Sequence, residues 1–142
     1  MKNIILCDID GTVANNDHRQ HFLEGKKDWD SFFDALDKDE PIFTIINKVI
    51  EENNSGREII FLTGRPERYR ETTEIWLIKY FNFEFKLLMR NDNDQRGKLE
   101  IKKEIFRSYF NINDIYYVIE NDIDLLKMWV ELSLVTFDVN DI

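Results

Sequence analysis

The sequence lacks the features that mark secreted and membrane-spanning proteins. Its 142 residues contain one cysteine, Cys7, so an internal disulfide is excluded. No apolar run approaches the length of a membrane span or of the apolar region of a signal peptide. These absences predict a protein of the reducing cytoplasm that has no membrane partner.

Positive charge is scarce as well. The chain carries 19 Lys and Arg residues against 28 Asp and Glu residues, which gives a formal net charge of -9. This charge repels a polyanion at long range, so a broadly basic nucleic-acid-binding surface is excluded and any phosphate recognition must be local. Apolar residues make up 43% of the chain, which is enough for a hydrophobic core. We therefore expect a single folded domain over residues 1–142.

Short apolar runs alternate with segments of helical periodicity. The runs predict strands at residues 3–7, 58–62, 85–89, 115–119 and 134–137. The intervening segments predict helices at residues 28–36, 41–52, 66–81, 97–109 and 122–132. This alternation predicts an α/β fold in which helices cover both faces of a central parallel sheet, with ligands bound beyond the carboxyl ends of the strands.

Local signals add detail to this outline. Pro41 and Pro66 suit the first turn of a helix, where the missing N–H costs nothing. Residues 13–27 form a long irregular segment after the first strand, and such segments are often functional, so we expect this one to flank the active site. The helix that follows carries Trp29, Phe32 and Phe33, which suit either the core or a contact surface.

Two carboxylates end the first predicted strand. Asp8 and Asp10 are separated by one residue, and two charges this close at the end of a buried strand call for a cation. Hard oxygen ligands suit magnesium, which takes one or two carboxylates and fills its other positions with water and substrate phosphate. Taken alone, Asp10 followed by Gly11 is also typical of a simple turn.

The full string Asp8-Ile9-Asp10-Gly11-Thr12 resembles the first motif of the haloacid dehalogenase (HAD) superfamily of phosphatases. The resemblance implies that Asp8 is a nucleophile that forms an aspartyl-phosphate, and that Asp10 acts as general acid and then as general base. It also implies that both residues contact Mg2+. The implied fold is the three-layer, Rossmann-like HAD fold, and three further motifs should follow in order.

The second motif should place a hydroxyl against the transferring phosphoryl group. Thr63 stands at the end of the next strand, followed by Gly64 and Arg65. Without the resemblance, Thr63 is typical of a helix N-cap, and a residue in that place lies where anions bind. The resemblance implies that Thr63 and Gly64 contact the substrate.

The third motif should supply a lysine that offsets the negative charge of nucleophile, metal and phosphate. Lys98, Lys102 and Lys103 are the candidates. Lys102 fits best, because it begins a Lys-Lys-Glu-Ile-Phe stretch that is similar to relatives in the family. Lys98 remains an alternative, since it lies one turn earlier on the same helix face.

The fourth motif should supply the remaining metal ligand. Glu120, Asn121 and Asp122 follow the fourth strand, where the superfamily more often has two aspartates. Glu120 occupies the first acidic position, so the metal contact is assigned to it, with Asn121 and Asp122 left open. Asp122 and Asp124 also suit the start of a helix, where acidic residues stabilise the N-terminus without any catalytic role.

A narrower likeness extends over nearly the whole chain. The stretches 65–70, 87–90, 102–106 and 127–129 are similar to the 3′-phosphatase domain of polynucleotide kinase/phosphatase repair enzymes. This likeness implies that Arg65, and Arg19 in the long loop, bind the terminal phosphate. No ATP site is expected, because the chain has no phosphate loop of the Gly-x-x-x-x-Gly-Lys-Ser/Thr type.

The spacing of the motifs leaves room for only a minimal cap. Two helices fit between the first and second motifs, and one helix and one strand fit between the second and third. An open site admits a polymer end, so the expected substrate is a 3′-phosphate on a polynucleotide. Two alternatives stay open: a nucleotidase acting on free mononucleotides, and a non-catalytic module that binds phosphorylated ends. The sequence favours neither DNA nor RNA and indicates no oligomeric state.

Overall fold

The computed structural model describes residues 2–141 and has a parallel sheet of five strands at its centre. The strands lie in the order β5-β4-β1-β6-β7, and every neighbouring pair is parallel. Their bounds are β1 (Ile4–Cys7), β4 (Glu58–Pro66), β5 (Lys86–Arg90), β6 (Ile115–Glu120) and β7 (Thr136–Asp138). All five predicted strands are therefore confirmed, although β4 extends past the expected end at residue 62.

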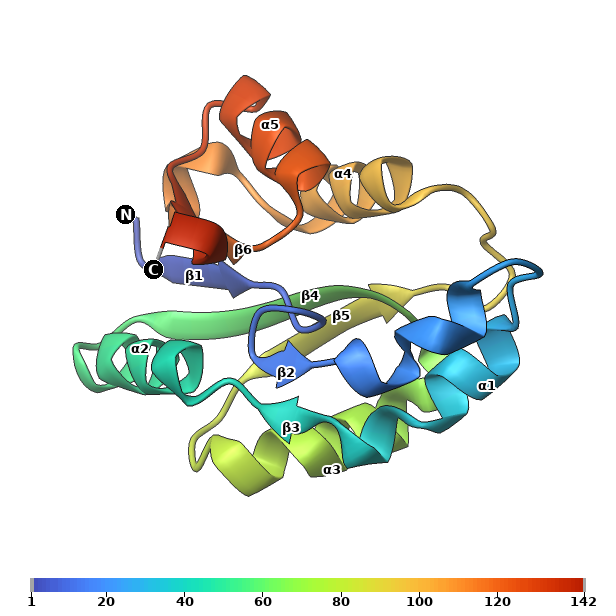
Figure 1. Cartoon of the computed structure of the whole chain (residues 1–142). Helices are drawn as coiled ribbons and strands as arrows, with labels where there is room; N and C mark the ends of the chain where they lie inside the picture. Colours follow the sequence, from blue (N-terminus) through green and yellow to red (C-terminus); the bar gives the residue numbers. More distant parts are fainter. Residues whose placement is uncertain (1, 142) are drawn as a thin grey trace.

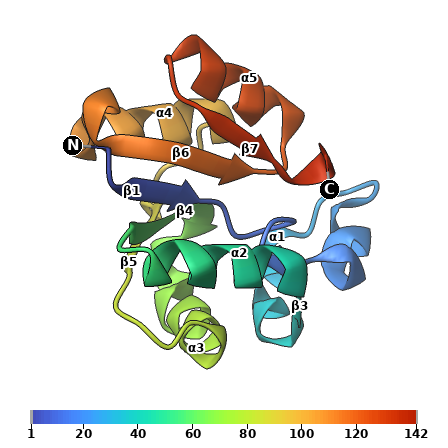
Figure 2. The same ribbon diagram turned by 90° about the vertical axis from the view of Figure 1, so that its left-hand side faces the viewer.

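Helices cover both faces of this sheet. The longer ones are α2 (Phe43–Asn54), α3 (Arg70–Tyr80), α4 (Lys98–Tyr109) and α5 (Ile123–Glu131), with a short α1 (Trp29–Asp34). In Figure 1, α4 and α5 lie above the sheet while α2 and α3 lie below it, and Figure 2 shows the same three layers end-on. The predicted α/β fold with a central parallel sheet is confirmed. No helix within residues 2–141 is long and apolar enough to cross a bilayer.

The alternation of side chains along β1 explains how the sheet joins two cores. Ile5 and Cys7 point to one face and pack with residues of α2 and α3, whereas Leu6 points to the other and packs with residues of α4 and α5. All three side chains are buried. β1 is thus packed on both faces, and the residue that follows it, Asp8, emerges from the middle strand of the sheet.

The two prolines do not occupy helical first turns, so that prediction is wrong. Pro41 lies in β3 (Glu40–Pro41), which pairs with β2 (Ala14–Asn15) as a short antiparallel ladder. Pro66 ends β4 with extended backbone angles, and a 3-10 turn, η3 (Glu67–Tyr69), separates it from α3. The fixed φ of proline fits extended backbone as well as helix, so the residue alone could not decide between them.

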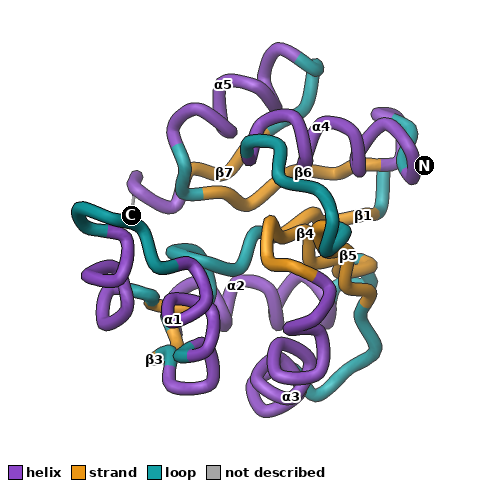
Figure 3. The backbone as a smooth tube through the Cα atoms, turned by 90° about the vertical axis from the view of Figure 1, so that its right-hand side faces the viewer, coloured by secondary structure: helices purple, strands orange, loops and turns teal. Residues whose placement is uncertain are grey.

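The predicted irregular segment is partly ordered into short elements. It contains β2 and the 3-10 helix η1 (Asp17–Leu23), and α1 follows, with a second 3-10 turn, η2 (Leu36–Lys38), before β3. Figure 1 shows η1 and α1 at the right-hand end, towards which β1 and β4 point, and Figure 3 views the molecule from that side. These short elements are the whole cap over the carboxyl edge of the sheet within residues 2–141, which confirms the expected minimal cap.

Candidate active site

Asp8 is the first residue beyond β1, and its side chain is buried. Its Oδ1 accepts a hydrogen bond from Lys102 Nζ at 2.7 Å, and its Oδ2 accepts one from Thr12 Oγ1 at 2.9 Å. Burial raises the pKa of Asp8 to about 8, and the charge of Glu120 adds to this rise, while Lys102 opposes both. Lys102 and Thr12 therefore hold Asp8 in a desolvated position that favours its protonated form, and the charge of Lys102 offsets part of this effect.

Lys102 lies on α4 with 3% of its surface exposed. Its ammonium group contacts Glu120 Oε1 at 3.1 Å as well as Asp8. Burial would lower the pKa of Lys102, but the two carboxylates outweigh burial and raise this pKa, so the side chain stays charged. The alternative candidate, Lys98, is exposed and contacts Asp122 Oδ2 at 2.5 Å. Of these two lysines, the structure brings Lys102 to the predicted nucleophile.

Glu120 ends β6 and is almost completely buried. Besides Lys102, its Oε1 accepts a hydrogen bond from Trp129 Nε1 at 3.3 Å. Its Oε2 accepts from the backbone N–H groups of Asn121 and Asp122, at 3.1 and 3.4 Å. Both carboxylate oxygens of Glu120 thus already have protein partners.

The Asn121 side chain lies beside the turn that follows the nucleophile. Its Oδ1 is 3.2 Å from Thr12 Oγ1. Gly11 has a φ of +77°, which residues with a side chain rarely adopt, so this turn favours glycine. A Cβ atom on Gly11 would also displace the Asn121 amide. Asp122, in contrast, caps α5 by accepting hydrogen bonds from the N–H groups of residues 124 and 125. This is the helix-start role that the sequence offered for Asp122.

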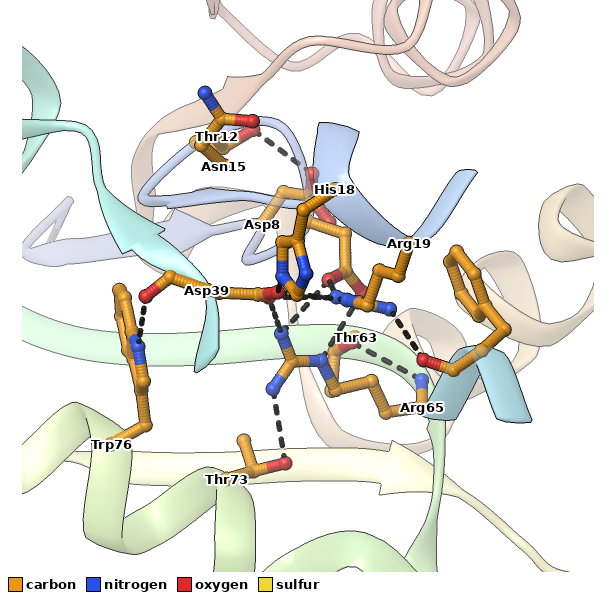
Figure 4. Close-up of polar contacts among 12 residues, drawn as sticks. Asp8, Thr12, Asn15, His18, Arg19, Asp39, Thr63, Arg65, Thr73 and Trp76 are labelled. Atoms are coloured by element: carbon orange, nitrogen blue, oxygen red, sulfur yellow. Dashed lines mark hydrogen bonds and ion pairs between the residues drawn. The ribbon is translucent and has the colours of Figure 1, made fainter. Parts of the chain in front are cut away.

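Asp10 is held by Arg65 and Arg19, the two arginines predicted to bind phosphate, both of which are labelled in Figure 4. Arg65 donates to both Asp10 oxygens, at 3.2 and 2.8 Å, and Arg19 donates to Oδ1 at 2.5 Å. Burial would raise the pKa of Asp10, but the charges and hydrogen bonds of Arg65 and Arg19 outweigh it and lower this pKa to about 2. Asp10 is therefore ionised in the free protein.

Asp39 is a central residue of this cluster that was not predicted from the sequence. Its buried carboxylate accepts two hydrogen bonds from Arg19, at 2.8 and 2.7 Å, and one from Arg65 at 3.2 Å. His18 Nε2 lies 2.7 Å from the same carboxylate. Asp39 stands in a run of charged residues, 37–40, that is typical of a solvated loop, and no local signal separates it from its neighbours.

Other contacts fix the two arginines in place. Arg19 stacks over the ring of Phe32 at 4.4 Å and donates to its carbonyl oxygen, while Arg65 donates to Thr73 Oγ1 at 3.1 Å. Both arginines are at most 1% exposed. Thr63 is buried near them, and its Oγ1 accepts from the N–H of Arg65 at 3.1 Å. Arg19, Thr63 and Arg65, which were predicted to bind substrate, thus lie on the same side of the site as Asp10.

We predict that Asp39→Asn lowers the free energy of unfolding by about 3–5 kcal/mol, because it leaves two buried guanidinium groups with one carboxylate fewer. Urea denaturation measures this loss. Asp37→Asn changes the same charge at an exposed position of η2 and should shift the stability by no more than about 0.5 kcal/mol. Equal stability of the Asp39→Asn protein and the wild type would contradict the role given to Asp39.

The donors around Asp8 suit a hard cation that needs few protein ligands. Within residues 2–141 no three His, Cys, Asp or Glu side chains form a cluster that could hold a metal ion. Asp8 provides a carboxylate and Asn121 provides a neutral amide oxygen, whereas the Asp10 carboxylate is already held by two arginines. This set fits magnesium, which takes one or two carboxylates and completes its shell with water and phosphate.

Comparisons with known proteins agree with the motifs. The family described as "Polynucleotide kinase PNKP phosphatase domain" matches residues 2–141. A putative bifunctional polynucleotide kinase/RNA ligase of Autographa californica nuclear polyhedrosis virus is 27% identical over 135 residues, which cover 93% of this chain and 18% of the viral protein.

Solved structures give the same result. A chain of the Pnkp1/Rnl/Hen1 RNA repair complex is 30% identical with a TM-score of 0.79, over 97% of this chain and 42% of that one. The class C acid phosphatase from Bacillus anthracis shares the fold, with 18% identity and a TM-score of 0.64 over 94% of this chain and 62% of its own. The chain thus spans less than half the length of the viral protein and of the repair-complex chain. Because the family match extends over nearly the whole sequence, the chain belongs to the polynucleotide kinase PNKP phosphatase-domain family, within the HAD superfamily.

Proposed function

We propose that the chain is a magnesium-dependent phosphomonoester hydrolase that removes 3′-phosphates from polynucleotide ends through an aspartyl-phosphate on Asp8. The observation that carries this proposal is the setting of Asp8. A buried carboxylate at a strand end, held by Lys102 and Thr12, is placed for nucleophilic attack. Burial raises its pKa, and a bound cation would favour the ionised form that attacks.

The covalent step uses Asp8 and Asp10 in turn. Asp8 attacks phosphorus in line with the leaving oxygen, so that a carboxylate–phosphorus bond forms as the ester bond breaks. Lys102 balances charge on the nucleophile, and Asp10 gives a proton to the leaving alkoxide. Asp10 then takes a proton from the water that hydrolyses the aspartyl-phosphate, which returns Asp8 to its free form.

Arg19 and Arg65 link substrate binding to the proton on Asp10. In the free protein both arginines hold Asp10 ionised, and an ionised carboxylate cannot act as an acid. An incoming phosphate competes with Asp10 for the same guanidinium donors, because arginine binds phosphate and carboxylate with the same fork geometry. We infer that this exchange of partners lets Asp10 take up the proton it must deliver.

For the metal we propose the Asp8 carboxylate, the Asp10 main-chain carbonyl and the Asn121 amide oxygen as the protein ligands. The Asp10 carboxylate is left free of the metal, because Arg65 and Arg19 hold it and it must carry the proton.

Glu120 was the residue expected from sequence, but its side chain is 1% exposed and accepts hydrogen bonds from four protein donors, against two for Asp8. The Asn121 side chain instead lies beside Gly11 and Thr12, in the turn after the nucleophile. When bound, Mg2+ neutralises the charge gathered by the carboxylates and the phosphate. An amide gives less negative charge than the aspartate usual at this position.

The small cap and the relatives support a polynucleotide end as the substrate. Only short elements of the described chain lie over the carboxyl edge of the sheet, and we infer that this small cap leaves room for a strand end. The family description names polynucleotide kinase, and one relative belongs to an RNA repair complex. A nucleotidase acting on mononucleotides with the same residues is the alternative, and the preferred substrate separates the two.

A substrate panel tests this choice. With Mg2+ present, we expect DNA or RNA oligonucleotides that end in a 3′-phosphate to be hydrolysed with a higher kcat/KM than nucleoside 3′-monophosphates or 5′-phosphorylated oligonucleotides. Excess EDTA should remove the activity. A kcat/KM that favours free mononucleotides would contradict the proposed substrate, and turnover that survives EDTA would contradict the metal.

A further inference from the structure

Trp29 is exposed although it sits in a cluster of aromatic side chains. The sequence has three tryptophans, and 47% of the Trp29 surface is accessible, whereas Trp76 and Trp129 are 5% and 1% exposed. The sequence left Trp29, Phe32 and Phe33 open between core and contact surface. Phe32 is buried, Phe33 is half-buried and Trp29 is exposed. One short helix therefore supplies a core residue and an exposed aromatic residue.

Neighbouring rings fix the orientation of this indole. Phe33 stacks against Trp29 with centroids 5.8 Å apart and an interplanar angle of 23°. Tyr69 in η3 packs on Phe33 at 5.3 Å, and the Tyr69 hydroxyl donates to Asp34. The indole is thus backed by other rings and held ready for contact, which lowers the entropy lost when a ligand stacks on it.

A chain of three contacts, through Phe32 and Arg19, links Trp29 to Asp10. The Trp29 ring meets Phe32 edge-on at 5.7 Å, and Phe32 lies under the guanidinium group of Arg19 at 4.4 Å. Arg19 in turn holds Asp10. Figures 1 and 3 show α1 at the end of the molecule towards which β1 points. The exposed indole is therefore part of the surface next to the site.

We propose that Trp29 stacks on a base of the polynucleotide strand whose 3′-phosphate lies at Asp8. This inference rests on the proposed function, because it requires a strand that leads into the site. Every base has a π face, so stacking tolerates any sequence, as an end-processing enzyme needs. Lys27 Nζ lies 5.7 Å from the Trp29 ring centroid on an exposed side chain, from which it can reach a strand phosphate.

Acidic groups near Trp29 are engaged with other side chains of the same wall. Asp28 caps α1 and bonds to Ser31, and Asp30 lies 3.8 Å from Arg68. Arg68 also pairs with Asp92, so acidic side chains of the protein already balance its charge. Apart from Lys27, charged groups therefore contribute little attraction here, and ring stacking is the interaction that Trp29 itself offers. The Trp29 contribution should accordingly change little with salt concentration, unlike phosphate contacts.

An abasic scan tests the inference. Oligonucleotides with a 3′-phosphate carry one abasic nucleotide at the first, second or third position from the end. For the wild type, KM should rise about tenfold at the position that stacks on Trp29, and Trp29→Ala should remove this sensitivity. Trp29→Ala should also lower kcat/KM for the intact oligonucleotide about tenfold more than for an aryl phosphate, and Trp29→Phe should keep part of the effect.

Tyr109→Ala is the matched control, since Tyr109 is a 67% exposed aromatic residue at the far end of α4, and it should change neither ratio. Binding is measured independently by quenching of the exposed Trp29 fluorescence with an oligonucleotide, which Trp29→Phe should remove. The same abasic profile in wild type and Trp29→Ala would overturn the inference and leave the proposed function standing. Quenching of Trp29 fluorescence without hydrolysis of any 3′-phosphorylated end would reject the proposed hydrolase function but keep the contact between the strand and Trp29. Absence of both quenching and hydrolysis would reject the function and the inference.

Discussion

Asp8→Asn should reduce Mg2+-dependent turnover of a generic aryl phosphate by at least about a thousandfold, because the amide cannot form an acyl-phosphate. The substitution should not unfold the protein. The raised pKa of Asp8 means that the folded state holds the proton more tightly than the unfolded chain. The stability that this bound proton contributes is therefore complete below the ordinary Asp pKa and is lost as pH rises towards about 8, so the buried Asp8 carries a cost at neutral pH.

The neutral amide in the Asp8→Asn protein removes this cost, so without metal at neutral pH its Tm should equal or exceed that of the wild type. Thermal unfolding and initial-rate assays of the same preparation measure both effects. A stable Asp8→Asn protein that retains more than about a tenth of wild-type turnover would contradict the nucleophile assignment. An inactive wild type would instead favour the non-catalytic end-binding module.

Lys102→Met should have the second largest effect, on stability as well as on rate. Without the ammonium group, Asp8 and Glu120 remain buried and uncompensated, and breaking a buried pair in this way costs about 3–5 kcal/mol. Turnover should fall by at least about a hundredfold, since the group that offsets charge on the nucleophile is lost. Urea denaturation and kcat measurements follow the two losses.

Two companion variants separate these effects. Lys98→Met removes an exposed lysine from the same helix, and its surface ion pair with Asp122 contributes no more than about 1 kcal/mol. Adding Glu120→Gln to Lys102→Met should recover part of the stability, because one uncompensated carboxylate is removed, but it should restore no activity. Loss of activity in Lys98→Met with normal activity in Lys102→Met would reverse the assignment of the third motif.

Sequence predicted the parts of the site that depend on local order. Asp8, Thr63 and Glu120 follow or end predicted strands, and parallel strands bring their carboxyl ends to one edge of the sheet. Lys102 could be preferred to Lys98 only through the resemblance to relatives, because both suit the same helix face. The structure separates them by burial and by contact with Asp8.

The features that sequence could not predict depend on contacts between distant segments. Asp39 pairs with Arg19 and Arg65 across 20 and 26 residues, and nothing in its own neighbourhood marks it as buried. The Glu120 carboxylate is held partly by Lys102 and Trp129, 18 and nine residues away on other elements. For the same reason, periodicity placed Trp29 on a helix but could not say whether its ring faced the core or solvent.

Trapping of the covalent intermediate tests the central claim most directly. Wild-type protein is mixed with Mg2+ and a 3′-phosphorylated oligonucleotide, quenched in acid within one turnover, and digested for mass spectrometry. We expect one phosphoryl group on the peptide that contains Asp8, absent from the Asp8→Asn protein and lost on continued incubation before the quench. Rapid hydrolysis with no phosphorylated peptide, or a phosphoryl group on a different residue, would contradict the account.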